Sequence, residues 1–135
     1  MAELKRILHV DDDEDIRVIA NMALEMVGNL EVLQCGSGRE ATEKAADFAP
    51  DLFLLDYMMP EMDGEQTLRA LRNLPGLQYV PVIFMTARVQ ADIADGLRRE
   101  GALEVITKPF DPMELANQIR EVWSSRPVVQ LRQAV

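Results

Sequence analysis

The sequence lacks the residues that build cross-linked or membrane-embedded proteins. It has one cysteine, Cys35, so it cannot form an internal disulfide, and this suits a reducing compartment. No stretch approaches the roughly 18 consecutive apolar residues of a membrane-spanning helix. The N-terminus also lacks the apolar segment of a secretory signal. We therefore expect a soluble, cytoplasmic protein in which Cys35 is a small buried side chain.

Basic side chains are also scarce. The 14 Lys and Arg face 23 Asp and Glu, for a formal net charge of −9, which argues against non-specific binding to nucleic acids or anionic lipids. Residues 1–65 carry 16 acidic and 5 basic side chains, whereas residues 66–135 carry 7 and 9. Some feature of the first half therefore gathers carboxylates. The single histidine, His9, lies in an apolar run, where we interpret it as a hydrogen-bonded strand residue and not a ligand.

The chain nevertheless has enough apolar residues for one compact domain. Of its 135 residues, 48% are hydrophobic, which is sufficient for a core and too many for a disordered chain. Five short, mostly apolar runs predict strands at residues 7–10, 31–34, 52–55, 82–85 and 103–106. The segments between and after them have helical spacing and capping signals. These predict helices that begin near residues 13, 37, 63, 90 and 112 and end near 27, 48, 73, 99 and 123.

The alternation of strands and helices indicates an α/β fold. Its parallel sheet is covered by helices on both faces and joined by right-handed crossovers. In the first helix, apolar spacing predicts a buried stripe of Ile16, Ile19, Ala20, Ala23 and Val27. For the fifth helix, Asp111 is the expected cap and Pro112 the first helical residue. We expect residues 1–123 to form the domain and residues 124–135 a tail, either frayed or docked on a partner.

Polar side chains follow four of the five predicted strands, at the edge where ligands bind in open parallel sheets. They are Asp11, Asp12 and Asp13 after the first strand, Asp56 after the third, Thr86 after the fourth and Lys108 after the fifth. The second strand contributes nothing obvious. Clustered carboxylates repel one another and lose solvation, so they require a cation or a proton. Oxygen ligands favour Mg²⁺ or Mn²⁺ over zinc, and a neighbouring lysine and hydroxyl suit a phosphoryl group.

Each of these residues also has a plain structural interpretation. The acids after the first strand could serve only the dipole of the next helix, and Asp56 could be a turn residue. Thr86 could be a cap and Lys108 a solvated charge. Their shared placement at one end of successive strands favours a binding site, because the structural interpretations do not predict it.

Four motifs, in order, resemble the receiver domain of two-component response regulators. They are Ile7 to Asp13 (ILHVDDD), Asp51 to Gly64 (DLFLLDYMMPEMDG), Met85 to Ala87 (MTA) and Thr107 to Phe110 (TKPF). The resemblance covers about residues 5–123. It implies a flavodoxin-like (βα)5 three-layer sandwich whose five-stranded parallel sheet has the order 2-1-3-4-5, as in chemotaxis receivers.

The resemblance assigns the acidic residues to phosphoryl transfer. Asp56 would be the phosphoacceptor, attacking the phosphohistidine of a sensor histidine kinase or a histidine phosphotransfer protein. Asp12 would bind Mg²⁺ (or Mn²⁺) directly and Asp11 mainly through water. Asp56 and the backbone carbonyl of Met58 would complete the protein ligands.

Other residues would hold the phosphoryl group or shape the loops around it. The resemblance implies that the Thr86 hydroxyl, the Lys108 ammonium and the Ala87 amide contact phosphoryl oxygens. The Lys108-Pro109 peptide would be cis, which aims the lysine. Gly64 would supply a strained turn in the loop after Asp56.

Two departures from the family pattern concern signalling and phosphate lifetime. Val105 stands where many receivers carry an aromatic switch residue, so signalling must use loop and helix shifts or another side chain. Met58 and Arg88 stand where the family tunes acyl-phosphate lifetime, and neither side chain suits the alignment of an attacking water. We therefore expect slow self-dephosphorylation.

The resemblance implies a signalling domain and not an enzyme proper. It would be a stand-alone receiver or a module of a longer chain, signalling by phosphorylation-dependent protein–protein interaction without nucleic acid or membrane. The expected output face, which could also form a homodimer, comprises helix 90–99, strand 103–106 and helix 112–123. On or near it, three arginines could meet an acidic partner: Arg98, Arg99 and Arg120.

Two alternatives remain at this stage. One is a Mg²⁺-dependent phosphatase with an aspartyl-phosphate intermediate, which is disfavoured by Met58 because such enzymes usually carry a second aspartate there. The other is a phosphate-independent interaction module on the same fold, which the intact set of acids, threonine and lysine makes less suitable.

Overall fold

A five-stranded parallel sheet forms the centre of the domain. In a computed structural model, which describes residues 3–87 and 91–126, its strand order is β2-β1-β3-β4-β5, as expected from the resemblance. Each strand lies within one residue of its predicted position at both ends: β1 (Arg6–Val10), β2 (Glu31–Cys35), β3 (Leu52–Asp56), β4 (Val82–Thr86) and β5 (Glu104–Thr107). All five residues of β3 are buried, as befits the central strand.

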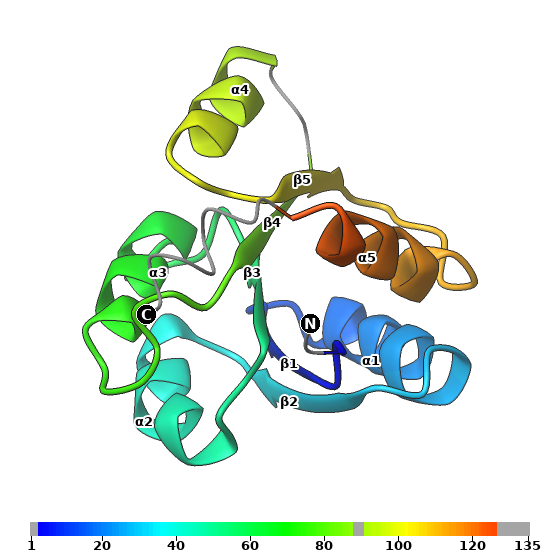
Figure 1. The fold of residues 1–135 in the computed structure, drawn as a ribbon, viewed down its shortest axis with the longest axis horizontal. Coiled ribbons are helices and arrows are strands. Elements are labelled where there is room, and N and C mark those ends of the chain that lie inside the picture. The colour runs from blue at the N-terminus through cyan, green and yellow to red at the C-terminus, as the bar shows by residue number, and fades with distance from the viewer. Residues whose placement is uncertain (1–2, 88–90, 127–135) are drawn as a thin grey trace.

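Helices cover both faces of the sheet. They are α1 (Glu14–Asn21), η1 (Met22–Val27), α2 (Gly38–Phe48), α3 (Gly64–Arg72), α4 (Ala91–Arg99) and α5 (Leu115–Ser124). Figure 1 shows α1 and α5 on one face and α2, α3 and α4 on the other. Within the described ranges, no helix is long and apolar enough to cross a bilayer.

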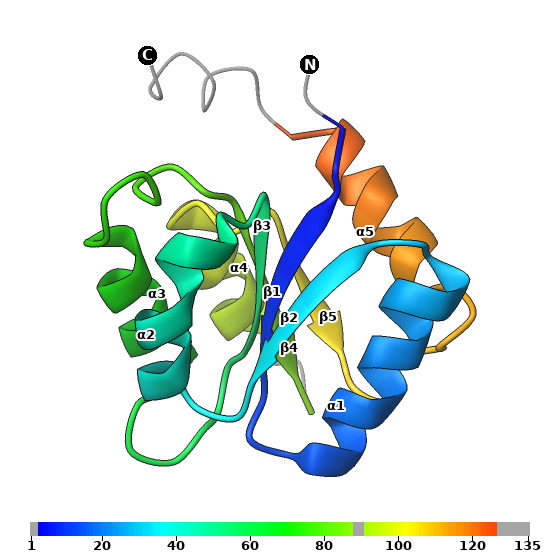
Figure 2. The ribbon, with the colours of Figure 1, turned by 90° about the horizontal axis from the view of Figure 1, so that it is seen from below.

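The strands alternate their side chains between two hydrophobic cores. Leu8, Phe53, Leu55 and Phe84 pack in the core beneath α2, α3 and α4. Their sequence neighbours pack in the other core, beneath η1 and α5; these include Ile7, Leu52, Leu54, Ile83 and Met85. Figure 2 shows that β1 starts near the last turn of α5 and that α1 starts at the opposite end of the sheet. The carboxyl edge of the strands is therefore well separated from the end where the described chain begins and finishes.

The first helix differs from its prediction. It continues from α1 into a π-helix, η1, in which the Gly28 amide donates to the Ala23 carbonyl five residues earlier, at 3.1 Å. The wider turn changes the angular spacing of side chains. Leu24 is therefore buried instead of Val27. Ile19 lies in α1, before this wider turn, and is 41% exposed. The predicted stripe is therefore wrong at these two positions. Apolar side chains remain on the surface along this segment: Val18, Ile19, Met22, Met26 and Val27.

The fifth helix begins later than predicted. Asp111 organises a separate turn, in which its side chain accepts from the Met113 amide at 2.9 Å and its carbonyl accepts from the Glu114 and Leu115 amides at 3.0 Å. The α-helix starts only at Leu115. A capping signal reports that the chain turns and does not distinguish one turn from the first turn of a helix.

The loop after β3 requires Gly64, although not for the predicted reason. Its φ is not positive, so the expected strained turn is absent. Gly64 is the first residue of α3, and its amide donates to the Tyr57 carbonyl at 2.9 Å. A Cβ at this position would lie 2.5 Å from the Asp56 carbonyl oxygen and 2.9 Å from the Tyr57 Cα. The glycine therefore allows a close approach of two backbone segments.

We expect Gly64→Ala to lower the free energy of unfolding by about 1–3 kcal/mol, because the added methyl group forces the two backbone segments apart. Gly96→Ala is the matched control. It lies within α4, where the nearest atom to an added Cβ is Arg99 Nη2 at 4.0 Å. There alanine should stabilise the helix by about 0.5–1 kcal/mol. Urea unfolding of both variants checks the pair, and equal effects would contradict the steric explanation.

Candidate functional site

Three carboxylates converge at the carboxyl edge of the sheet. Asp11 and Asp12 follow β1, and Asp56 is the last residue of β3. One oxygen of each lies within 4.8 Å of the others. Asp11 is fully buried, Asp56 is 5% exposed, and Asp12 faces solvent. The structure thus brings together three of the four acids that the sequence placed at one edge, in an arrangement able to hold a cation. The fourth, Asp13, is the N-cap of α1.

Lys108 contacts two of these acids. Its Nζ lies 2.9 Å from Asp11 Oδ2 and 3.3 Å from Asp56 Oδ1. The Lys108 amide donates to the Thr86 carbonyl at 2.8 Å, which holds the residue beside the end of β4. The Lys108-Pro109 peptide is cis, as the resemblance implied. Residues at the carboxyl ends of β1, β3 and β5 therefore form one charged cluster.

The charges in this cluster shift one another's pKa. Burial and the neighbouring Asp11 charge raise the pKa of Asp56 to about 6, a change that Lys108 opposes but does not cancel. Burial lowers the pKa of Lys108, yet hydrogen bonds and attraction from Asp11 and Asp56 raise it overall. One lysine therefore serves two buried acids, with Asp12 beside them. A divalent cation would compensate the remaining negative charge.

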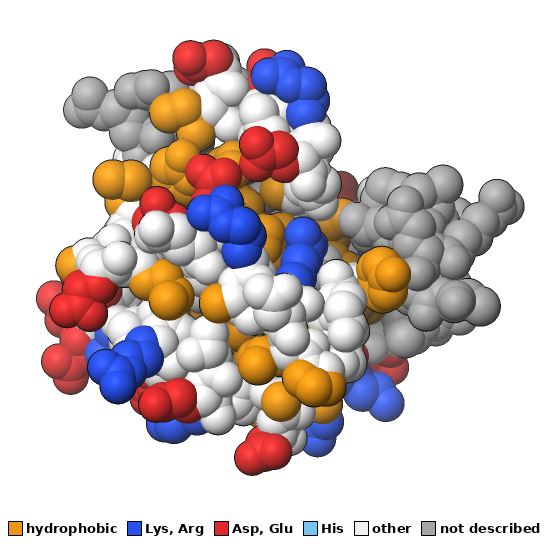
Figure 3. Space-filling view, turned by 90° about the vertical axis from the view of Figure 1, so that its left-hand side faces the viewer, with side chains coloured by type: hydrophobic (Ala, Val, Ile, Leu, Met, Phe, Trp, Pro, Cys, Tyr) orange, Lys and Arg blue, Asp and Glu red, His pale blue; other side chains and the backbone are white. Residues whose placement is uncertain are grey.

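A cavity of about 340 Å³ adjoins the charged cluster. Its polar end includes four of the predicted site residues besides Asp56, namely Met58, Thr86, Ala87 and Lys108. Its other walls are largely apolar and come from α4, β5 and the start of the β3–α3 loop: Tyr57, Ile93, Ala94, Leu97 and Val105. Hydrophobic side chains are visible beneath α4, at the top of Figure 3. The predicted site residues thus lie together, next to space that reaches under α4.

An aromatic residue of this region was missed by the sequence analysis. Val105, which stands at the position of the aromatic switch residue, is buried and lines the cavity. Tyr57, directly after Asp56, packs edge-on against Phe84 with ring centroids 6.1 Å apart. Its hydroxyl donates to Glu65 Oε1 at 3.1 Å. An aromatic ring therefore does line the cavity, but it comes from the β3–α3 loop.

The second strand also contributes to the site, contrary to the prediction. Gln34 Nε2 lies 3.0 Å from His9 Nδ1 and donates to the Arg17 carbonyl at 2.7 Å. Arg17 Nη1 donates to the Asp11 carbonyl at 2.7 Å. Glutamine and arginine occur on most protein surfaces, so neither residue carries a sequence signal for this network.

Two buried residues behave partly as expected. His9 is hydrogen-bonded through Nδ1, but its Nε2 has no partner among the described residues, so the prediction of a satisfied side chain is half right. Burial, Lys108 and Arg17 lower its pKa to about 3, which leaves the ring neutral at physiological pH. Cys35 is buried as predicted, and burial together with Glu40 raises its pKa to about 11. It is therefore protonated and unreactive at neutral pH.

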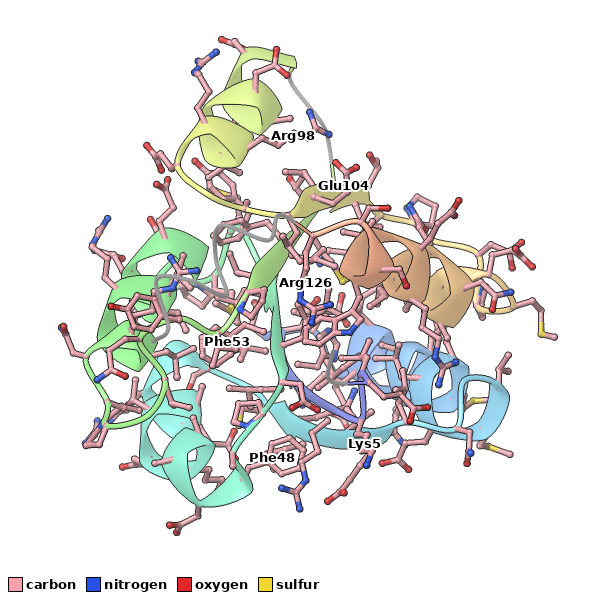
Figure 4. The ribbon with its side chains drawn as sticks, viewed as in Figure 1. Lys5, Phe48, Phe53, Arg98, Glu104 and Arg126 are labelled. Atoms are coloured by element: carbon pink, nitrogen blue, oxygen red, sulfur yellow. The ribbon has the colours of Figure 1, made fainter. Side chains whose placement is uncertain are left out.

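The predicted output face carries fewer available arginines than expected. Arg98 on α4 points toward Glu104 on β5 (Figure 4), and its Nε donates to Glu104 Oε1 at 2.8 Å. Arg120 on α5 donates to the Gly28 carbonyl at 2.6 Å, at the end of η1. Both side chains are thus engaged within the domain. Arg88 and the tail beyond residue 126 lie outside the described residues.

We expect the contribution of Asp56 to the stability of the metal-free protein to fall as the pH rises from about 4 to above 6, whereas the buried His9, whose pKa is lowered, acts in the opposite direction. The folded pKa of Asp56, about 6, lies above its ordinary value of 3.8, so the folded state binds this proton more tightly than the unfolded chain does. That contribution is fully present below the ordinary pKa and is lost as the pH rises through the folded one. Asp56→Asn should therefore raise the free energy of unfolding by about 1–3 kcal/mol at pH 7.5 and change it little at pH 4.

Urea unfolding in the presence of a chelator, at the two pH values, measures this difference. Asp47→Asn, a neutralisation of an exposed acid on α2, is the matched control and should show no comparable pH dependence. An equal effect of Asp56→Asn at both pH values would show that the carboxyl group is not destabilised by its surroundings.

The chain is similar to known proteins in sequence and in fold. The chain is 38% identical over 115 residues to the regulatory protein AtoC of Escherichia coli, covering 85% of this chain and 24% of that protein. It is 37% identical over 118 residues to the phosphate regulon transcriptional regulatory protein PhoB of Pseudomonas aeruginosa, covering 87% and 51%. Among solved structures, the chemotaxis protein CheY4 of Vibrio cholerae matches with a TM-score of 0.80 at 28% identity, covering 89% of this chain and 99% of that one.

The chain spans about a quarter of the length of AtoC and about half of PhoB, so the match concerns one domain of those proteins. The family defined as the response regulator receiver domain matches residues 7–120, nearly the whole of the sheet and its helices. The strand order, the acidic cluster with its lysine and this match agree: the chain belongs to the response regulator receiver domain family of two-component signalling.

Proposed function

We propose that this domain accepts a phosphoryl group on Asp56 from the phosphohistidine of a sensor histidine kinase or a histidine phosphotransfer protein. The observation that carries the proposal is the position of Asp56 at the carboxyl edge, beside Asp11 and 3.3 Å from Lys108 Nζ. A carboxylate oxygen of Asp56 attacks phosphorus, the phosphorus–nitrogen bond breaks, and the imidazole leaves and takes up a proton. The products are an aspartyl phosphate on this chain and an unmodified histidine on the partner.

The acidic cluster suits Mg²⁺, or Mn²⁺, as the cofactor. Its donors are hard oxygens, which these ions prefer. Both oxygens of Asp11 already accept hydrogen bonds, Oδ1 from the Asp13 amide and Oδ2 from Lys108. Asp12, Asp56 and the Met58 carbonyl would therefore hold the ion directly and Asp11 through water. When bound, the cation neutralises charge on phosphoryl oxygens.

The clamp for the phosphoryl group would come from the ends of β4 and β5. Lys108 supplies a positive charge that is already aimed at Asp56. Thr86 is the last residue of β4, and its hydroxyl would bind a phosphoryl oxygen. The Ala87 amide would contribute a further donor. Because Lys108 already lies beside Asp56, this charge needs little reorganisation for the transfer.

The partner that carries the histidine must reach this edge of the sheet. The first turns of α1 adjoin it, with Val18 55% and Ile19 41% exposed, and Met22 and Met26 extend this apolar surface along η1 away from the edge. We propose this surface as the docking area for a helical segment of the histidine-bearing partner, because burying it would stabilise a complex that places the histidine over Asp56.

Phosphorylation would be read out through α4, β5 and α5. The phosphoryl group recruits Thr86 at the polar end of the cavity, whose far wall is formed by Leu97 and Val105. A shift of α4 toward this space would change the face that comprises helix 90–99, strand 103–106 and helix 112–123. A downstream protein, or a second copy of the domain, would bind the changed face.

The boundaries and the compartment are parts of the same proposal. We propose residues 1–123 as the receiver domain and residues 124–135 as a tail; α5 runs one residue past this boundary, to Ser124. Signalling by kinases of this kind takes place in the cytoplasm, where we place the domain. The domain itself acts as a signalling partner that phosphorylates and slowly dephosphorylates itself.

Incubation with a small phosphodonor and Mg²⁺ tests the phosphoacceptor. We expect a stable adduct of about 80 Da by intact-mass spectrometry, corresponding to one phosphoryl group. Asp56→Asn should abolish it, and chelation of Mg²⁺ should prevent it in the unaltered protein. Asp47→Asn, at an exposed position on α2, should leave it unchanged.

The other outcomes identify the alternatives. Rapid turnover of many phosphate esters without a lasting adduct would indicate a phosphatase. Absence of both adduct and turnover would indicate a phosphate-independent interaction module.

The lifetime of the aspartyl phosphate should be long, because Met58 offers no group that orients an attacking water. Met58 is 69% exposed at the mouth of the cavity, so replacement there is compatible with folding. Met58→Asn should shorten the lifetime severalfold, since a carboxamide can align water for attack on phosphorus. Met58→Leu is the control and should leave the lifetime unchanged. If Met58→Asn retains or prolongs the phosphate, this explanation is wrong.

A further inference from the structure

Hydrogen bonds from β2 and α1 hold the backbone where β1 ends and the loop with Asp11, Asp12 and Asp13 begins. The Asp11 amide continues the sheet ladder by donating to the Cys35 carbonyl at 3.1 Å. The Asp11 carbonyl, where the chain leaves the sheet, accepts instead from Arg17 Nη1 at 2.7 Å. The backbone of Asp11 is therefore held at its amide by β2 and at its carbonyl by a guanidinium group of α1.

Gln34 fixes the segment of α1 that carries this guanidinium. Its Nε2 donates to the Arg17 carbonyl, and because a carbonyl can only accept, the orientation of the amide is determined. The second hydrogen of Nε2 then points to His9 Nδ1 at 3.0 Å, which must be the acceptor. Gln34 thus links β1, through His9, to the first turns of α1.

The loop after β2 restricts the guanidinium group further. A Cβ at Gly36 would lie 3.3 Å from Arg17 Nη1, so the group lies against the bare backbone of this glycine. The Gly36 amide donates to Glu40 Oε1 at 2.7 Å, and Arg17 is among the charges that lower the pKa of Glu40. Arg17 is therefore held by β2, the β2–α2 loop and its own helix, and it lies next to Asp11 without touching a carboxylate of the acidic cluster.

We propose that Arg17, held in place by Gln34, is a positioning residue for the divalent cation. It fixes the Asp11 carbonyl and thereby the spacing between the Asp11 and Asp12 carboxylates. This inference rests on the proposed function, in that Asp12 and Asp56 must bind the ion. It goes beyond that proposal by giving β2 and α1 a part in metal affinity.

The sign of the effect separates positioning from simple electrostatics. Arg17 is a positive charge close to a site for a cation, so removing it should strengthen cation binding if charge alone matters. If Arg17 acts by holding the backbone of the acidic loop, removing it should weaken binding. A purely structural role would lower the stability of the metal-free protein and leave the dissociation constant unchanged.

The test measures binding of Mn²⁺ alone, from the loss of the free-ion signal in electron paramagnetic resonance. We expect Arg17→Met to raise the dissociation constant roughly tenfold, the usual effect of losing a group that orients metal ligands. Gln34→Met should act in the same direction but less strongly, and the double variant should bind no more weakly than Arg17→Met alone. Arg17→Lys, which keeps the charge and a donor, should recover most of the affinity.

Two further variants make the outcomes distinguishable. Lys44→Met removes an exposed positive charge that pairs with Glu40 and should leave Mn²⁺ binding unchanged. Asp12→Asn reports on the metal site itself. If Asp12→Asn binds as well as the unaltered protein, the proposed metal site and this inference both fail. If Asp12→Asn loses binding while Arg17→Met binds as tightly as the unaltered protein or more tightly, only the positioning role is wrong. Thermal unfolding without metal confirms that each variant is folded.

Discussion

The arrangement of the site depends on one lysine that bridges two buried acids. Lys108 follows β5, at one edge of the sheet, and its ammonium reaches Asp56 at the end of β3 and Asp11 at the end of β1. Loss of one partner of a buried ion pair generally costs about 3–5 kcal/mol, because the other charge remains without compensation. Here the loss would leave two acids facing each other. The strand order and the turn after β5 therefore place Lys108 where its positive charge compensates the two acids.

The positions of the site residues could be predicted because parallel strands share one carboxyl edge. Any residue that directly follows a strand must lie there, so finding the strands suffices to group Asp11, Asp12, Asp56, Thr86 and Lys108. The strands themselves could be predicted to within one residue, because runs as short and as uniformly apolar as β3 and β4 are typical of buried strands. The family resemblance then supplied the strand order, which apolar periodicity alone does not determine.

The parts that escaped prediction depend on contacts between elements. Arg17 and Gln34 are ordinary surface residues by type. The pairing of β1 with β2 places Gln34 beside His9, where it binds the Arg17 carbonyl, and Arg17 in turn binds the Asp11 carbonyl. The π-helix is a second case. Gly28 allows Ala116 of α5 to approach so closely that a Cβ on the glycine would lie 2.5 Å from it, and Arg120 binds the Gly28 carbonyl. Packing of α5 against this end of the segment is not encoded in the apolar spacing that the prediction used.

The cavity beneath α4 links the charge balance to signalling. In the proposed reaction a phosphoryl group adds nearly two negative charges beside a lysine that already serves two acids. New donors must therefore be drawn toward Asp56, and Thr86 stands at the polar end of a cavity of about 340 Å³. Val105 and Leu97 leave this space open where a larger residue would fill it, so movement of Thr86 need not displace a side chain. A shift of α4 into this space must instead loosen the contacts that hold α4, among them the hydrogen bond between Arg98 and Glu104. The strength of the response is then limited by how much better the phosphoryl group binds the shifted arrangement than the resting one.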